Sequence, residues 1–252
     1  DAVSSAGAVP AVTAVIDGCP RVGLDDAELD RLAADRDARK LAARDLAAAI
    51  SSRASGGTTV SASLTLCAGA GVRVFATGGI GGVHRGWNDR PDVSADLHAL
   101  ARHSICVVCA GAKSILDLPA TVEALETLSI PVVGWRCDSF PRFVSGPDPA
   151  LPLGARVDDA KTAAAVCRSH WKLGGGAVLI VSPVDPADAI DESSASNPLP
   201  AATGSGASVT PELLGRLVEA TEGRSLRANV QLLRANAATA ASIALQLANA
   251  PR

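Results

Sequence analysis

Lys113 is the residue of this chain whose surroundings most favour covalent chemistry. It follows an apolar run at residues 105–110 and a glycine, Gly111, and it precedes Ser114. This pattern predicts a strand, a tight turn and then a helix, and ligands of open α/β sheets bind at such turns. Burial there would lower the pKa of the lysine and yield the free amine that attacks carbonyl carbons. A solvated surface lysine is the alternative interpretation.

Two aspartates and a serine, Asp92, Ser94 and Asp96, precede a segment with a helical pattern. At spacing i and i+4 the two carboxylates share the first turn of a helix, where the helix dipole favours negative charge. Helix capping accounts for one aspartate. A hard divalent cation held by one carboxylate and several waters would account for the group. His98 and His103, further along, are expected to be packing or surface residues.

Two glycine-containing stretches could hold an anion or a small ligand. Residues 56–59, Gly-Gly-Thr-Thr, precede a predicted helix whose free N–H groups would face an anion. An ordinary turn with an N-cap also explains them. Residues 77–85, TGGIGGVHR, follow a predicted strand but depart from the dinucleotide pattern G-x-G-x-x-G at His84. We interpret these glycines as allowing the backbone to approach a smaller ligand; a plain strand-end turn is the alternative.

The totals predict a large intracellular α/β domain. The chain has 252 residues, a net charge of −3 and 48% hydrophobic but only 2% aromatic residues. The charge offers no field that attracts nucleic acid or anionic lipid, so neither is an expected partner. Cys106 and Cys109 have the CxxC spacing, but side chains three apart on a strand point to opposite faces. We therefore expect structural thiols and a cytoplasmic or other reducing intracellular compartment.

Alternating strands and helices predict a single-domain, three-layer α/β/α sandwich around a largely parallel or mixed sheet, spanning residues 1–252. Asp25 and Glu28 have capping-box spacing at the start of a helix, and helical character continues towards residue 50. Residues 140–153 are expected to be irregular and residues 187–208 a flexible loop. The strands are expected at residues 9–17, 72–76, 105–110, 130–135 and 177–181, and the later helices at 61–71, 120–128, 158–171, 210–223 and 226–247.

Seven stretches together resemble the indigoidine synthase A-like family of pseudouridine-5′-phosphate glycosidases over almost the whole chain. They are VPAVTAVIDG, GGTTVSA, RVFATGGIGGVHRG, DVSADL, VVCAGAKSILD, IPVVGW and TEGRSLRANV. The resemblance implies reversible cleavage of the C–C glycosidic bond of pseudouridine 5′-phosphate to uracil and ribose 5-phosphate. It also implies one Mn²⁺ per subunit and a homotrimer.

The resemblance assigns roles to ten residues of this chain. Lys113 corresponds to the lysine that forms a Schiff base at C1′ of the opened ribose. Asp92 corresponds to the metal ligand. The residues expected to contact substrate are Lys40, Thr59, Val60, His84, Ser94, Ala95, Asp96 and Asn229, and of these Lys40, Thr59, Val60 and Ser94 are expected around the phosphate.

The chain departs from the family pattern in three places. The family's general-acid glutamate belongs to a segment upstream of Asp1, so we expect an N-terminal segment to be missing. Residues 187–208 stand where the family usually has a longer helical, charged insertion, and we expect this chain to lack the carbohydrate-kinase domain that is fused to some family members. Two alternatives therefore stay open. One is a catalytically silent module that binds sugar phosphate or serves assembly, and the other is a related lyase acting on another C-nucleoside or sugar phosphate.

Overall fold

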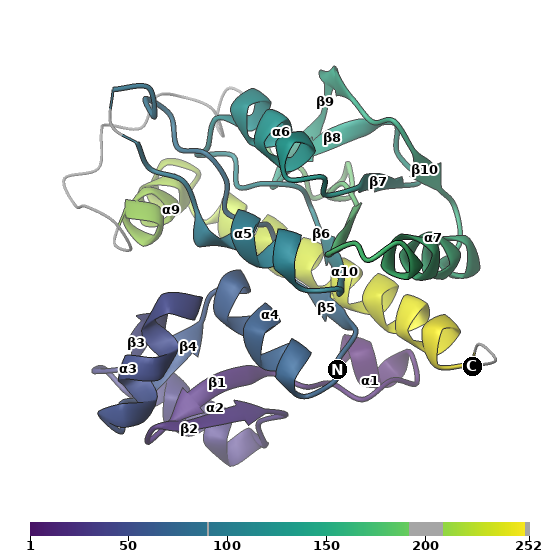
Figure 1. Ribbon diagram of the computed structural model, residues 1–252. Coiled ribbons are helices and arrows are strands. Elements are labelled where there is room, and N and C mark those ends of the chain that lie inside the picture. Colours follow the sequence, from purple (N-terminus) through teal and green to yellow (C-terminus); the bar gives the residue numbers. More distant parts are fainter. Residues whose placement is uncertain (90, 192–208, 250–252) are drawn as a thin grey trace.

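Five parallel strands form the main sheet of the protein, whose computed structural model describes residues 1–89, 91–191 and 209–249 (Figure 1). The strand order is β10-β7-β11-β6-β5, and each neighbouring pair is parallel. The strands are β5 (Val74–Ala76), β6 (Cys106–Cys109), β7 (Val132–Trp135), β10 (Arg156–Val157) and β11 (Val178–Val181). Four of the five lie where the sequence predicted them, and β10 was not predicted.

Two interior strands of this sheet, β6 and the central β11, are buried at every residue. Their sequences, CVVC and VLIV, are the continuous apolar runs expected of parallel strands covered on both faces. Cys109 packs in the core on one face of the sheet and Cys106 in the core on the other. The prediction that these two thiols point apart and cannot share a metal is therefore confirmed. Cys19, in contrast to the other cysteines, is exposed.

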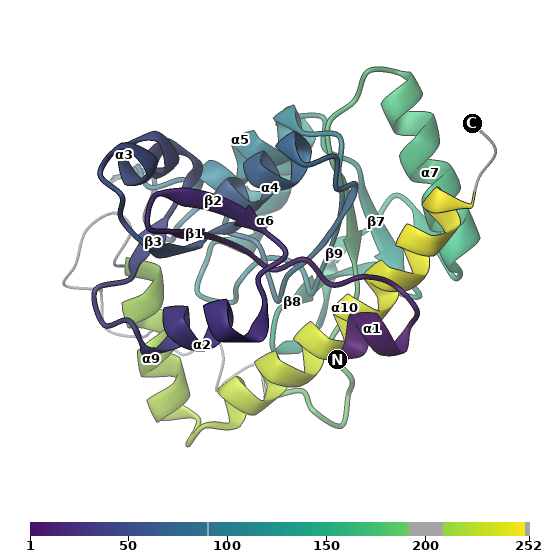
Figure 2. The same cartoon turned by 90° about the horizontal axis from the view of Figure 1, so that it is seen from below.

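Helices cover both faces of this sheet, which confirms the three-layer sandwich (Figure 1). One face is packed against α4 (Val60–Gly69), α5 (Ala95–Arg102) and α6 (Leu118–Thr127). The other face is packed against α7 (Ala160–Lys172) and the long α10 (Arg224–Ala248). The short α1 (Ala2–Ser5) lies beside α10 (Figure 2). No described helix is both long and apolar enough to span a lipid bilayer.

A second, four-stranded sheet has the order β2-β1-β4-β3. Its strands are β1 (Thr13–Ile16), β2 (Cys19–Val22), β3 (Arg39–Leu41) and β4 (Gly56–Thr58). The predicted helical continuation to residue 50 is wrong at this point, since Lys40 lies on β3, paired in parallel with Gly57 of β4. Only after a 3₁₀ turn, η1 (Ala43–Asp45), does α3 (Leu46–Ser51) begin. A Cβ on Gly56 would lie 2.3 Å from the Arg39 carbonyl oxygen, so the close pairing requires glycine there.

Helix α4 joins the two sheets. Ala62 packs with Val15 and Leu41 in the core of the small sheet. Leu64 and Cys67 pack in the core of the main sheet. Because one helix supplies both cores, its N-terminus is held at the junction between the sheets.

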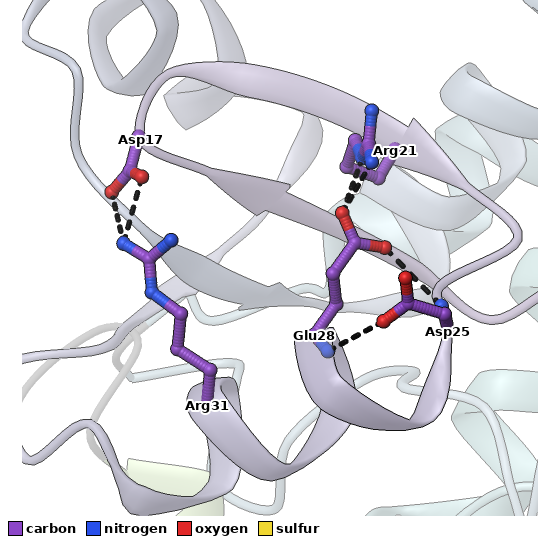
Figure 3. Close-up of polar contacts among 5 residues, drawn as sticks. All are labelled: Asp17, Arg21, Asp25, Glu28 and Arg31. Carbon is purple, nitrogen blue, oxygen red and sulfur yellow. Dashed lines mark hydrogen bonds and ion pairs between the residues drawn. The ribbon is translucent and has the colours of Figure 1, made fainter.

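Helix α2 (Asp26–Ala34) is attached to the β1–β2 hairpin by charged contacts, and none of its residues is buried. Its predicted capping box is confirmed: the Glu28 N–H donates to Asp25 Oδ1 over 2.8 Å, and the Asp25 N–H donates to Glu28 Oε2 over 3.2 Å. Figure 3 shows the two ion pairs that reach the hairpin, Arg31 with Asp17 at 2.7 Å and Arg21 with Glu28. These contacts orient α2.

Two segments predicted to lack regular structure are partly ordered. Residues 140–153 lie largely in a hairpin of β8 (Ser139–Arg142) and β9 (Ser145–Pro152), which corrects the irregular assignment. At the start of the predicted loop 187–208, Ile190 is buried and its N–H donates to the Val144 carbonyl over 2.9 Å. Residues 192–208 lie outside the described residues. Helix α9 (Val209–Ala220) follows them.

Replacing Ile180 with alanine should lower the free energy of unfolding by about 2–5 kcal/mol, because it leaves a cavity in the fully buried central strand β11. Leu173→Ala is the matched control. Its side chain is 87% exposed, so its change should stay within roughly 0.5 kcal/mol. Urea unfolding followed by circular dichroism measures both, and equal losses would contradict the assigned core.

Candidate active site

A cavity of about 760 Å³ lies where the N-terminus of α4, the glycine-rich loop after β5 and the loop after β6 meet. Segments far apart in the chain contribute to its lining. All ten residues singled out from the sequence line it: Lys40, Thr59, Val60, His84, Asp92, Ser94, Ala95, Asp96, Lys113 and Asn229. The structure thus brings the predicted set together in one place.

Lys113 is presented to this cavity by a turn that only glycine can make. Gly111 has φ +77°, and a Cβ on it would lie 2.1 Å from the Pro141 carbonyl oxygen. The Lys113 N–H then donates to the Ile80 carbonyl over 3.2 Å, which fastens the turn to the glycine-rich loop. The helix expected directly after Lys113 is not formed, since α6 begins at Leu118.

Lys113 is a half-buried residue, and desolvation of its amine lowers its pKa below the usual lysine value. The negative charge of Asp96 opposes this shift because it stabilises the ammonium form. A lysine of this kind reaches its neutral, nucleophilic form at a lower pH than a solvated lysine does. The solvated alternative considered from the sequence does not describe this side chain.

Asp96 is the buried carboxylate that ties the walls of the cavity together. Only 4% of the residue is exposed. Oδ1 accepts a hydrogen bond from the Ser61 N–H of α4 and Oδ2 accepts one from the Gly81 N–H of the glycine-rich loop, each over 2.9 Å. Both oxygens therefore accept backbone hydrogen bonds. The predicted contact of Asp96 with substrate stays a prediction.

Helix α5 begins just after Asp92 and not at it. Ser94 is the N-cap, and its Oγ accepts a hydrogen bond from the Asp96 N–H over 3.2 Å. Asp92 thus lies outside the first turn that the i, i+4 spacing had suggested. The Ser94 N–H donates to the Gly82 carbonyl over 2.9 Å, so the segment from 92 to 96 and the glycine-rich loop are held together at backbone level.

Glycine is required in this loop for a different reason from the one inferred from the sequence. A Cβ on Gly81 would lie 2.2 Å from Ser94 Oγ, and one on Gly78 would lie 2.6 Å from Asn229 Oδ1. The space beside these glycines is filled by side chains of the protein itself. Close packing of the loop, more than close approach of a ligand, therefore requires glycine here.

One end of the cavity is suited to an anion. Thr59 is the N-cap of α4 and Val60 its first residue, so the positive end of the helix dipole and its first N–H groups lie at the cavity. Lys40 lines the same region. The residue as a whole is exposed on β3, but partial desolvation of its amine, together with the charge of Lys113, lowers its pKa. Arg39 and Arg44 also line the cavity.

His84 and Asp92 lie side by side at another part of the lining. The backbone N–H of His84 donates to the backbone carbonyl of Asp92 over 3.0 Å. In the side chains, His84 Nδ1 lies 4.0 Å from Asp92 Oδ2. Burial and the charges of Lys113 and Lys40 lower the pKa of His84, although Asp92 opposes the shift. The imidazole is therefore neutral near pH 7.

The residues available for a metal are few. Within the described parts of the chain, no group of three or more His, Cys, Asp or Glu side chains could hold an ion. Asp92, with 37% of its side chain exposed, is the carboxylate that remains available at the cavity, because both Asp96 oxygens accept backbone hydrogen bonds. Such a site fits a hard cation that keeps most of its water ligands.

Sequence reasoning missed one residue that supports the cavity from outside its lining, Asn236, and several residues of the lining itself. Asn236 donates from Nδ2 to the Thr77 carbonyl over 2.8 Å and so fixes the start of the glycine-rich loop. Its spacing of seven from Asn229 places both amides on one face of α10, a signal that could have been read from the sequence. The lining residues that it missed include Leu32, Arg39, Arg44, Phe143, Leu214 and Leu233.

Asp96→Asn should lower the free energy of unfolding by about 1–3 kcal/mol, because an amide nitrogen would face one of the two backbone donors. Asp92→Asn is the matched control, since its side chain is half-exposed and should cost less than about 0.5 kcal/mol. Urea unfolding of both variants checks this; similar losses would mean that Asp96 is not the tie between α4 and the loop.

Residues 1–246 match the family model described as indigoidine synthase A like protein. A relative from Streptomyces griseus is 48% identical over 257 residues, which cover 98% of this chain and 79% of the relative. A relative from Gemmatimonas aurantiaca is also 48% identical and covers 98% of this chain and 82% of its own length. Both relatives are named pseudouridine-5′-phosphate glycosidase.

Two solved structures of related proteins have the same fold as this chain. A prealnumycin C-glycosynthase in complex with ribulose 5-phosphate superposes with a TM-score of 0.90 at 38% identity, and an indigoidine synthase A-like protein from Thermotoga maritima with a TM-score of 0.92 at 33% identity. Each comparison covers 98% of this chain and 83% of the other. The resemblance inferred from the sequence is confirmed: the chain is an enzyme of the indigoidine synthase A-like family, and its relatives from Streptomyces griseus and Gemmatimonas aurantiaca are both named as glycosidases.

Proposed function

We propose that this enzyme reversibly splits the C–C glycosidic bond of pseudouridine 5′-phosphate, giving uracil and ribose 5-phosphate through a Schiff base on Lys113. The observation that carries the proposal is that the half-buried Lys113, whose pKa is lowered, lines the same cavity as the N-terminus of α4. The names of the two relatives and the ribulose 5-phosphate bound to the glycosynthase support a sugar phosphate as ligand.

The chemistry explains why a lysine is needed. A C–C glycoside has no leaving oxygen to protonate, so a pair of carboxylates gives little help. If the Lys113 amine bonds to C1′ as O4′ leaves with a proton, its nitrogen lone pair can then form the C1′=N bond. The C1′–C5 electron pair goes to uracil, whose C5 takes a proton. Water finally adds to the iminium, which releases ribose 5-phosphate and restores the amine.

The polar lining supplies the other roles. The proposal places the phosphate at the N-terminus of α4, against Lys40, the Thr59 hydroxyl, the Val60 N–H and Ser94. Neutral His84 can accept or return a proton near Lys113. Asn229, Ala95 and Asp96 are proposed to border the sugar and the base.

Asp92 is proposed to hold one Mn²⁺ per subunit, with water completing the coordination shell. When bound, the ion would supply positive charge that stabilises developing negative charge on substrate oxygens. Asp92, the proposed ligand of the ion, lies beside His84, and the bound cation would lower the pKa of His84 further. We also propose a homotrimer, which sedimentation equilibrium would test.

A second candidate reaction is favoured by one comparison. The glycosynthase at 38% identity is named for prealnumycin, whereas the two curated relatives are named for pseudouridine 5′-phosphate. A related lyase or synthase that uses the same lysine with another C-linked ring is therefore the alternative to the pseudouridine reaction.

Reduction with borohydride in the presence of ribose 5-phosphate should attach one pentose phosphate to Lys113, as read by peptide mass spectrometry. Because desolvation lowers the Lys113 pKa, the trapping rate should rise with pH around a midpoint below 10.5, the usual lysine value. Lys113→Arg should abolish the adduct, while Lys161→Ala, an exposed change on α7, should leave it intact. Labelling that survives Lys113→Arg would overturn the assignment.

Asp92→Asn should remove saturable Mn²⁺ binding, measured by the loss of the free-ion paramagnetic resonance signal, and with it any dependence of turnover on manganese. Asp138→Asn, an exposed aspartate paired with Arg156, is the control and should leave the titration unchanged. An unaltered manganese titration in Asp92→Asn would remove Asp92 as the ligand.

A further inference from the structure

The hydroxyl of Thr59 does not cap the helix that Thr59 begins. Thr59 is the N-cap of α4, yet its side chain accepts no hydrogen bond from the first turn of that helix. A threonine in this position usually accepts one from an N–H two or three residues further on. In α4 the N–H two residues on belongs to Ser61, and it donates to Asp96 Oδ1 over 2.9 Å. A carboxylate from α5 therefore does the capping, and the Thr59 hydroxyl is left for another partner.

That partner is the side chain of Ser61. Thr59 Oγ1 and Ser61 Oγ lie 3.0 Å apart, and the distance lets either oxygen donate. Ser61 Oγ also accepts a hydrogen bond over 3.2 Å from the backbone N–H of Ala43, in the 3₁₀ turn η1. Ser61 is only 1% exposed, so bulk water does not compete for its hydroxyl.

The direction of the bond between Thr59 and Ser61 follows from the number of protons available. A serine hydroxyl has one proton and two acceptor lone pairs. The Ala43 N–H occupies one lone pair of Ser61 Oγ, and Thr59 Oγ1 is its other partner within the part of the chain that the structure describes. A buried hydroxyl proton without an acceptor is unfavourable, so Ser61 donates and Thr59 accepts. The proton of Thr59 then remains available to a ligand, because Thr59 lines the cavity.

We propose that Ser61 is a positioning residue that fixes the Thr59 hydroxyl as a hydrogen-bond donor towards an anion in the cavity. This inference rests on the proposed function, which places the phosphate of the substrate against Thr59. A hydroxyl that already accepts from Ser61 offers its proton to the ligand, and phosphate oxygens accept such a proton strongly because they are charged. Ser61 thereby favours a phosphorylated sugar over the same sugar without phosphate, although it does not itself contact the substrate.

Ser61→Ala tests the hydroxyl by itself, because alanine retains the backbone N–H that donates to Asp96. The measurement is the second-order rate constant for borohydride trapping of a pentose on Lys113, with ribose 5-phosphate and with ribose. The constant for ribose 5-phosphate should fall about tenfold, because the Thr59 hydroxyl can then turn away from the phosphate. The constant for ribose, and the trapping rate at saturating ribose 5-phosphate, should not change.

Ser63→Ala is the matched control. Ser63 lies on the same helix and is 3% exposed, but its hydroxyl accepts from Thr13 and donates to Thr58 instead of reaching Thr59. The variant therefore loses buried hydrogen bonds of the same kind without touching the proposed donor. Both of its rate constants should stay at the wild-type values.

A double-variant cycle separates positioning from packing. Thr59→Val removes the hydroxyl that Ser61 is proposed to orient, and it should lower the ribose 5-phosphate constant at least as much as Ser61→Ala does. Adding Ser61→Ala to Thr59→Val should change that constant by less than about twofold, because the group through which Ser61 acts is already absent. If Ser61 acted by packing, the two losses would multiply.

The outcomes separate this inference from the proposed function. Absence of any pentose adduct in the wild type would overturn both. An adduct that forms normally, with Ser61→Ala slowing both sugars alike or with losses that multiply in the double variant, would overturn the inference alone. Circular dichroism checks that each variant is folded. If Ser61→Ala does not fold, Ser61→Cys takes its place with the same expectation, since a thiol is a weak donor.

Discussion

The structure depends on one buried carboxylate that joins two backbone segments. Asp96 accepts hydrogen bonds from the N-terminal turn of α4 and from the glycine-rich loop. The first segment belongs to the helix shared by both sheets, and the second follows an edge strand of the main sheet. A carboxylate buried in this way is stable because each oxygen has a donor, and removing either donor would leave charge without a partner. The cavity lies between the two segments that Asp96 joins.

The same carboxylate moderates the chemistry of the cavity. Desolvation lowers the pKa of Lys113, and the negative charge of Asp96 limits that shift. Lys40 and Lys113 in turn disfavour protonation of His84. The cavity thus combines an amine of lowered pKa, a neutral imidazole and an anion-binding helix terminus. Each of these states is set by the position of the others, so the groups act as one electrostatic unit.

The division of the lining between polar and apolar groups suits a family with varied reactions. The polar side chains come from the strand ends, the glycine-rich loop and α4, which the hydrogen bonds of Asp96 and Ser94 hold rigidly. The apolar side chains come from α2, α9, α10 and a hairpin turn, at the edges of the fold. Segments at the edges tolerate change more readily than a buried hydrogen-bonded framework. Relatives named as a glycosidase and as a C-glycosynthase share the fold at high TM-score or identity.

Local features of the sequence determined the buried strands β6 and β11, the capping box of α2 and the glycine turn that precedes Lys113. Each depends on a short run of residues: an apolar stretch, a serine or acid at fixed spacing, a glycine before a lysine. Tertiary structure alone decided that Lys40 lies on a strand and that residues 140–153 lie largely in a hairpin. It also decided that both Asp96 oxygens accept hydrogen bonds from backbone N–H groups. The physical reason is that strand β3 gains its hydrogen bonds from β4, and Asp96 from residues 15 and 35 positions away. Hydrogen-bond partners this far away in the chain cannot be predicted from a residue and its immediate neighbours, whereas a buried strand can be predicted from its apolar run.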